Sequence, residues 1–235
     1  MQPEADDQIR NPHRLRYLID IGILVAASFF LYAFVSSFVP VPNIRAGFVF
    51  DVIRRLLLIG VAWLLIRLRG QRLVDIGLAR PKKWTRTFIL GALIAAVVFA
   101  AIYLSERAGF RRDLSTFREV EGNLELTIYA VGYAFVGAGL YEEFTFRGFL
   151  FQGLAMFFGG SRSAWIAACI VQAAIFGAAH AYQNPLGILI TGTLGLLFGL
   201  IVLACGRNLW VAIIVHGLYD AGRFVLFYFQ GPPLG

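Results

Sequence analysis

The stretch YEEFTFRGFL, residues 141–150, places two adjacent glutamates and an arginine inside an otherwise apolar run. An ionisable side chain at the centre of a bilayer costs at least about 2.5 kcal/mol, so this pattern predicts a functional site within the membrane. The alternative is an ion pair at a helix end, level with the lipid headgroups. His180 and His216, each in its own apolar segment, favour the functional interpretation.

The spacing of these side chains assigns them to helix faces. Glu143 and Arg147 are four residues apart and can pair on one face, whereas Glu142 is rotated about 100° away and is left free. His216 and Asp220 are also one helical turn apart, so the carboxylate can hold or polarise the imidazole.

A carboxylate and two imidazoles are suited to the activation of water. The sequence has no serine beside a base, no glycine-rich phosphate loop and no cofactor fingerprint, so nucleophilic and nucleotide mechanisms lack their parts. Glu142 can act as a general base while one histidine orients the water and the other donates to a developing oxyanion. Taken singly, each histidine would be explained by a hydrogen bond between helices.

Three short motifs in fixed order resemble a known family. They are EExxxR at Glu142, Glu143 and Arg147, FxxxH at Phe176 and His180, and HxxxD at His216 and Asp220. The same order is found in the CPBP family of CAAX prenyl endopeptidases and bacteriocin-processing or abortive-infection proteins, which are intramembrane proteases. The resemblance is limited to residues 142–220, and the earlier segments are similar only in being hydrophobic helices.

The resemblance implies a role for each motif residue. Glu142 would be the general base, His180 would position the water, and His216 would stabilise the oxyanion together with Asp220. The family often has asparagine at the position of Asp220, and an ionised aspartate cannot donate a hydrogen bond. Asp220 would therefore be protonated or would orient His216. The supporting residues would be Glu143, Arg147 and Phe176.

Metal dependence stays open at this stage. Glu142, His180, His216 and Asp220 form a set that can bind zinc, although the HExxH signature is absent. Members of the family have been described both as metalloproteases and as glutamate proteases. We expect the metal-free glutamate mechanism and no cofactor, with zinc as the alternative.

The composition requires a membrane. The chain has 235 residues, of which 59% are hydrophobic and 15% charged, with a mean hydropathy of +0.72. The net charge of +7 comes from basic residues between the apolar runs, as the positive-inside rule expects, and no nucleic-acid-binding motif accompanies them. These features predict an integral protein of the plasma (inner) membrane with a cytoplasmic N-terminus, and no nucleic-acid partner.

Seven apolar runs are long enough to cross the bilayer. They are residues 17–39, 48–68, 87–104, 124–160, 164–180, 185–204 and 209–229. We therefore predict an all-α polytopic membrane protein of about seven transmembrane helices around a polar intramembrane cavity. Residues 1–16 are expected to be a mobile polar tail, and residues 17–235 a single transmembrane domain with its catalytic motifs in 142–220.

Several segments between or within these runs carry further expectations. Asp51 and Arg55 are expected to pair one turn apart in the second run. The basic stretch 67–86 predicts a short surface helix on lipid, and 105–123 a solvated amphipathic connector. The long run 124–160 fits either one tilted helix or a helix broken near Gly137 and Gly139.

Small residues in the later runs predict close packing. Gly195 and Gly199 form a GxxxG pair, which more often joins helices of one chain than two chains. Cys169 and Cys205 both lie in apolar runs and are expected to be packing residues rather than halves of a disulfide.

These observations predict an intramembrane endopeptidase that hydrolyses a peptide bond in a membrane-anchored protein or peptide. Two alternatives come from other classes. One is a non-catalytic immunity or scaffold protein that keeps the polar cluster for binding. The other is a transporter or proton relay, since buried Glu, His and Arg also serve there.

Overall fold

The computed structural model describes residues 12–38 and 44–235, and all regular elements in these ranges are helices. The long helices are α2 (Pro12–Phe38), α3 (Ile44–Leu68), α4 (Trp84–Arg107), α5 (Leu124–Tyr133), η3 (Ala134–Phe151), α6 (Gln152–Phe157), α7 (Arg162–Ala179), α8 (Asn184–Ala204) and α9 (Trp210–Gln230). Short helices η1 (Leu73–Ile76), η2 (Ser115–Val120) and η4 (Ala181–Gln183) lie between them. Of the predicted polar tail, residues 12–16 belong to α2, and residues 1–11 lie outside the described ranges.

Within the described ranges, six helical stretches are long and apolar enough to cross a membrane. They are Arg14–Phe34, Trp84–Arg107, Leu124–Phe157, Arg162–Ala179, Ala181–Ala204 and Trp210–Gln230. The predicted count of seven is not confirmed, because α3, although 25 residues long, carries charged side chains and is not among them.

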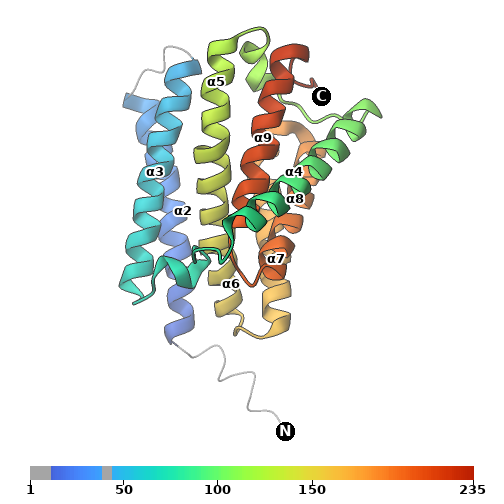
Figure 1. Cartoon of the computed structure of the whole chain (residues 1–235). Coiled ribbons are helices and arrows are strands. Elements are labelled where there is room, and N and C mark those ends of the chain that lie inside the picture. Colours follow the sequence, from blue (N-terminus) through green and yellow to red (C-terminus); the bar gives the residue numbers. More distant parts are fainter. Residues whose placement is uncertain (1–11, 39–43) are drawn as a thin grey trace.

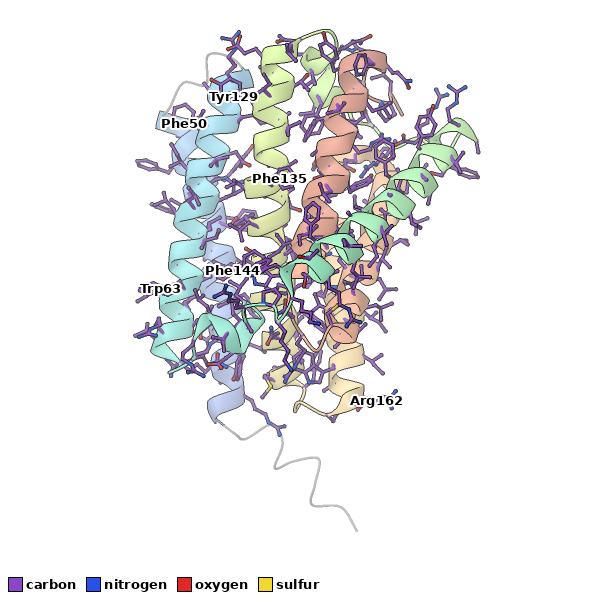
Figure 2. All side chains as sticks on the ribbon, viewed as in Figure 1. Phe50, Trp63, Tyr129, Phe135, Phe144 and Arg162 are labelled. Atoms are coloured by element: carbon purple, nitrogen blue, oxygen red, sulfur yellow. The ribbon has the colours of Figure 1, made fainter. Side chains whose placement is uncertain are left out.

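Large apolar side chains cover the outside of the bundle (Figure 2), including Trp63, Tyr129 and Phe135, each more than two-fifths exposed. Such a surface is stable only in lipid. The protein is therefore an all-α polytopic integral membrane protein.

The helices form one bundle, and α5 and η3, from the middle of the chain, lie between α3 and α9 (Figure 1). Helices α2 and α3 lie side by side, and α3 packs against α5 and η3. Helix α9 packs along α5 and η3, and α4 crosses α9 obliquely (Figure 1). Helices α7 and α8 form an antiparallel pair that contacts η3 and α9.

Helices α5, η3 and α6 run without interruption over Leu124–Phe157. The structure therefore favours a single long helix over a helix broken near Gly137 and Gly139. Its middle part, Ala134–Phe151, is wound as a π-helix, a form that is rare and frequently found at functional sites. The glutamates of the first motif lie in this part.

Helices α7 and α8 touch through glycines, as the sequence predicted for Gly195 and Gly199. A Cβ atom at Gly195 would lie 3.1 Å from a ring carbon of Phe176, and one at Gly199 would lie 2.6 Å from Sγ of Cys169. At Gly177 an added Cβ would lie 2.6 Å from the carbonyl oxygen of Ile188. Only glycine permits this approach, so the glycine pair serves packing within the chain.

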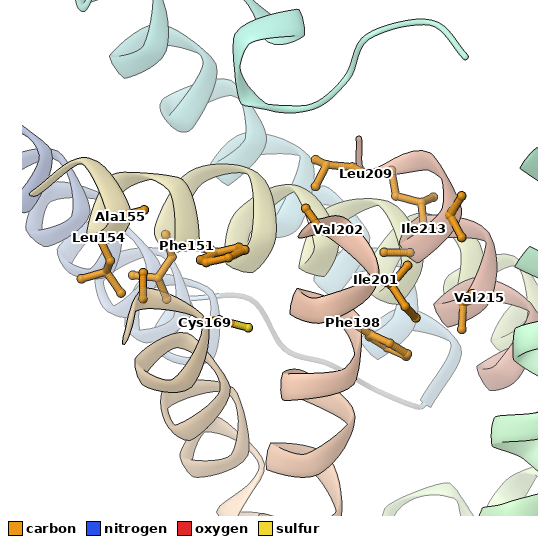
Figure 3. Close-up of a cluster of buried hydrophobic side chains, with 14 of the residues drawn as sticks. Phe151, Leu154, Ala155, Cys169, Phe198, Ile201, Val202, Leu209, Ile213 and Val215 are labelled. Atoms are coloured by element: carbon orange, nitrogen blue, oxygen red, sulfur yellow. The ribbon is translucent and has the colours of Figure 1, made fainter. Parts of the chain in front are cut away.

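The largest apolar core joins η3, α6, α7, α8 and α9 (Figure 3). It includes Phe151, Phe198 and Val202, and Cys169 is buried in it as a free thiol. Cys205 is also a free thiol, so the expectation of two unpaired cysteines is confirmed.

The connector after α4 is less solvated than predicted. Glu106 at the end of α4 is buried and forms an ion pair with Arg223 of α9, at 2.7 Å. Arg112 is also buried, and donates to the hydroxyl of Tyr219 at 2.5 Å and to the side-chain oxygen of Gln183 at 3.3 Å. The mixed charge of residues 105–123 predicted a solvent-exposed segment, but hydrogen-bond and ion-pair partners on other helices bury Glu106 and Arg112. The basic stretch 67–86 contains the end of α3, the short helix η1 and the first turn of α4.

Candidate active site

A cavity of about 350 Å³ lies inside the bundle and is lined by polar and aromatic side chains. It brings together all four candidate catalytic residues, Glu142, His180, His216 and Asp220. These come from η3, the end of α7 and α9, which are far apart along the chain. The cavity extends towards the connector between α4 and α5, whose Arg112 also lines it.

Glu143 lies behind the cavity wall and is fully buried. Its Oε1 accepts a hydrogen bond from Nη1 of Arg147 at 2.9 Å, as the spacing predicted. The same oxygen lies 2.7 Å from Nδ1 of His216. Because a carboxylate can only accept, the ring donates from Nδ1, and Nε2 is turned towards the cavity residues. Glu143 is therefore the residue that orients His216, a role the sequence analysis did not give it.

Phe176 of the FxxxH motif contacts two other motif residues, Arg147 with its ring and His180 with its backbone carbonyl. The Arg147 guanidinium lies 4.3 Å from the centre of the Phe176 ring, a favourable cation–π contact. The Phe176 carbonyl oxygen lies 2.8 Å from Nδ1 of His180. A carbonyl only accepts, so Nδ1 of His180 donates and its Nε2 remains an acceptor for a ligand in the cavity.

Glu142 is the carboxylate that faces the cavity. Its Oε1 accepts a hydrogen bond from Nη1 of Arg55 on α3 at 2.9 Å. Its Oε2 lies 3.9 Å from Nε2 of His216. That separation is too long for a direct hydrogen bond, and suits two groups that contact one water molecule between them.

Asp220 also lies near the His216 imidazole, at Nε2 rather than at the Nδ1 that contacts Glu143. Its Oδ2 lies 3.5 Å from Nε2 of His216, one helical turn away as predicted. The distance is at the limit of a hydrogen bond, whereas the contact of His216 with Glu143 is short. Asp220 therefore faces Nε2 of a ring that Glu143 already holds in place.

Arg55 is fixed by several groups besides Glu142. Its Nε donates to Asp51 at 2.5 Å, which confirms the predicted pair, and its Nη1 also donates to the carbonyl oxygen of Gly137 at 2.9 Å. The hydroxyl of Tyr133 donates to Asp51 at 2.8 Å. The guanidinium lies 4.7 Å from the ring centre of Tyr141.

The sequence analysis missed the contact between Arg55 and Glu142, although a signal for it was present. The first two turns of the apolar run 48–68 contain one acid, Asp51, and two arginines, Arg54 and Arg55. One acid cannot neutralise both, and Arg54 also pairs with Asp51. A buried charge needs a partner, so the extra arginine pointed to an acid on another helix.

The arrangement of the four expected metal donors does not decide metal dependence. Among the residues that the structure describes, no three side chains of His, Cys, Asp or Glu are arranged to hold a metal ion. Oε1 of Glu142 binds Arg55 and Nδ1 of His216 binds Glu143, but Oε2 of Glu142 and Nε2 of His216 still face the cavity, and a carboxylate on Nδ1 is also a usual partner of a histidine that binds a metal through Nε2. The zinc alternative is therefore left to the chelation test below.

Comparison with known proteins gives one match. No curated protein and no solved structure matches the chain. The family described as type II CAAX prenyl endopeptidase Rce1-like matches residues 123–222. This segment holds all three motifs and the four candidate catalytic residues, whereas Arg54, Arg55, Arg112 and Arg223, which also line the cavity, lie outside it. Over residues 123–222 the chain thus matches the Rce1-like type II CAAX prenyl endopeptidase family, in agreement with the resemblance carried by the three motifs.

Proposed function

We propose that this protein is an intramembrane endopeptidase that hydrolyses a peptide bond in a membrane-anchored protein or peptide, with water activated by Glu142. The observation that carries the proposal is the cavity that joins Glu142, His180 and His216 inside an apolar bundle. A water-holding cavity is what hydrolysis within a membrane requires. The family match over residues 123–222 supports the same reaction class.

In the first step Glu142 removes a proton from water, and the hydroxide oxygen bonds to the scissile carbonyl carbon. Nε2 of His180 accepts a hydrogen bond from this water and holds it near the substrate. The carbonyl oxygen becomes an oxyanion, which Nε2 of His216 stabilises in its protonated form. Three carboxylates, those of Glu142, Glu143 and Asp220, lie within 4 Å of this ring and favour that form.

In the second step the carbon–nitrogen bond breaks as Glu142 returns the proton to the leaving amine. The oxyanion becomes a carbonyl group again, so the products are a carboxylic acid, which then gives its proton to the amine, and the amine itself, while Glu142 is again ionised. The Asp220 carboxylate lies on the cavity side of the His216 ring and balances the positive charge of the protonated imidazole. Glu143, Arg147 and Phe176 hold the two histidines and do not react.

The test uses the purified protein in phospholipid vesicles with a quenched fluorescent peptide. The peptide carries a prenylated cysteine followed by two aliphatic residues and a C-terminal residue, the substrate type named in the family description. We expect cleavage by the wild type, a decrease of about 10³-fold for Glu142→Gln and of about 10²-fold for His180→Ala. Glu119→Gln, the same change at an exposed position of η2, should cleave at the wild-type rate.

Unchanged cleavage in Glu142→Gln would end the proposed mechanism. Loss of cleavage with a chelator, restored by zinc, would replace it with the metal-dependent alternative. If no product forms while the protein still binds the lipidated peptide, the non-catalytic scaffold function is favoured. Ion flux without product would favour the transporter.

A further inference from the structure

Arg55 comes from a part of the chain that the family match does not reach. The match covers residues 123–222, whereas Arg55 is on α3. Its contact with Glu142 joins positions 87 residues apart. Every other group that we assign to the reaction lies within the matched segment. The question is whether Arg55 only neutralises a buried charge or also contributes to the reaction.

The position of Arg55 is set by groups on three sides. Asp51 holds its Nε, and the Gly137 carbonyl oxygen accepts from the same Nη1 that contacts Glu142. Asp51 is itself held by the Tyr133 hydroxyl and by Arg54. The Arg55 side chain is only 14% exposed. A guanidinium held in this way is a fixed support rather than a mobile counter-ion.

The contact with Arg55 makes the two oxygens of Glu142 unequal. Oε1 is occupied by the guanidinium, and Oε2 lies 3.9 Å from Nε2 of His216. A partial rotation of the carboxyl group would break the hydrogen bond to Arg55, whereas a half-turn only exchanges two equivalent oxygens. The ion pair therefore keeps one carboxylate oxygen directed to the cavity, on the side where His216 also points.

We propose that Arg55 is a positioning residue of the hydrolytic site, whose guanidinium binds Oε1 of Glu142 and thereby presents Oε2 to the water that attacks the substrate. This inference rests on the proposed function. It assigns to α3 a part in the reaction, in addition to its part in the wall of the cavity. Lysine cannot replace the arginine fully, because one ammonium group cannot reach Asp51, Glu142 and Gly137 in the same geometry.

The experiment compares Arg55→Gln and Arg55→Lys with Arg45→Gln in the peptide cleavage assay. Arg45 is the matched control, because it is an arginine of the same helix that pairs with an acid on α5, Glu125, but its side chain is half exposed and does not line the cavity. We expect kcat of Arg55→Gln to decrease about 100-fold with little change in KM, as expected when a reacting group is misplaced by about 1 Å. Arg55→Lys should recover part of kcat, and Arg45→Gln should keep kcat near the wild-type value.

Rates are normalised to monodisperse folded protein, so that loss of fold is not counted as loss of kcat. Equal decreases in kcat for Arg55→Gln and Arg45→Gln, or wild-type kcat in Arg55→Gln, would overturn the positioning role. If Arg55→Gln does not fold, Arg55→Lys and Asp51→Asn give the same comparison, and a kcat equal to wild type in both would overturn it.

A second measurement does not depend on activity. The melting temperatures of Glu142→Gln, Arg55→Gln and the double variant form a cycle, and the contact predicts that the two single shifts do not add. An absence of peptide cleavage by the wild type would remove the proposed function. Additive shifts together with an active wild type would remove only the role of Arg55.

Discussion

Glu142 and Glu143 are adjacent in sequence and lie in opposite environments. Glu143 is fully buried, and its Oε1 contacts both Arg147 and His216. Glu142 lines the cavity, and its partner Arg55 comes from a helix outside the family match. Two consecutive residues of η3 therefore have different roles, because Glu143 holds other side chains and Glu142 faces the cavity.

This difference teaches how a buried acid can be kept available. A carboxylate such as that of Glu143, whose hydrogen-bond partners all lie outside the cavity space, can only hold other side chains in place. Glu142 has one oxygen bound and the other directed to the cavity, so it is stabilised and still accessible. The following predictions test this contrast through stability, in order of decreasing expected effect.

The largest effect is expected for Glu143→Gln. The change leaves the Arg147 guanidinium without its acid at a position with no solvent exposure, and breaking a buried pair in this way costs about 3–5 kcal/mol. Thermal unfolding in detergent measures the change. In the double variant Glu143→Gln, Arg147→Met the unpaired charge is gone, so much of the loss should be recovered. A double variant as unstable as the single one would contradict the assignment.

A smaller effect is expected for Phe176→Leu. Leucine keeps the backbone carbonyl that binds His180 but removes the ring 4.3 Å from the Arg147 guanidinium. The lost cation–π contact and packing should reduce stability by about 1–2 kcal/mol. The decrease should be much smaller when Arg147 is already replaced by methionine. An unchanged decrease in that background would show that the ring acts through packing alone.

Glu142→Gln should change stability by less than about 1 kcal/mol, although we expect it to decrease cleavage about 10³-fold. The glutamine oxygen can still accept from Arg55, and Arg55 keeps its ion pair with Asp51. The same thermal assay checks this prediction beside Glu143→Gln. Equal destabilisation by the two substitutions would remove the distinction between the adjacent glutamates.

The smallest effect concerns Asp113, an exposed carboxyl group in the connector outside the membrane. The backbone N–H of Ser115 donates to it at 2.9 Å and lowers the pKa of this carboxyl group. A lowered pKa in the folded state stabilises the protein above the unfolded value of about 3.9, and this stabilisation is lost as the pH falls through the folded pKa.

The melting temperature of Asp113→Asn should therefore lie slightly below that of the wild type at pH 7. The difference should decrease as the pH falls below the unfolded value of about 3.9 and disappear below the folded pKa, where the wild-type carboxyl group is also neutral. A difference that grows as the pH falls would contradict this assignment.

The sequence predicted contacts within a helix and missed those between helices. The pairs Glu143–Arg147 and Asp51–Arg55 follow from residues four apart on one helix, and both are present. The contacts of Glu142 with Arg55 and of Glu143 with His216 depend on how separate helices pack, which spacing along the chain does not encode. The charge excess on α3 indicated only that some acid was needed.

The element boundaries were predicted more closely than the environment of the connectors. Helix α8 was expected at 185–204 and spans Asn184–Ala204, because Asn184 and Pro185 mark its start. Glu106 was expected in solvent but is buried against Arg223. A segment of mixed charge can face either solvent or a charged residue of a neighbouring helix, and its sequence does not distinguish the two.

The contact between α7 and α8 has a mechanical consequence. Their backbones touch at Gly177, so there are no intervening side chains there that could change rotamer. The two helices should behave as one rigid wall, and His180 at its end should keep its depth whatever is bound. Helix α3 contributes Arg54 and Arg55 to another wall of the same cavity. Because Arg55 is held there by Asp51 and by the Gly137 carbonyl oxygen, we expect Glu142 and His180 to keep their separation when a ligand enters, and the remaining side chains of the lining to adapt to the ligand.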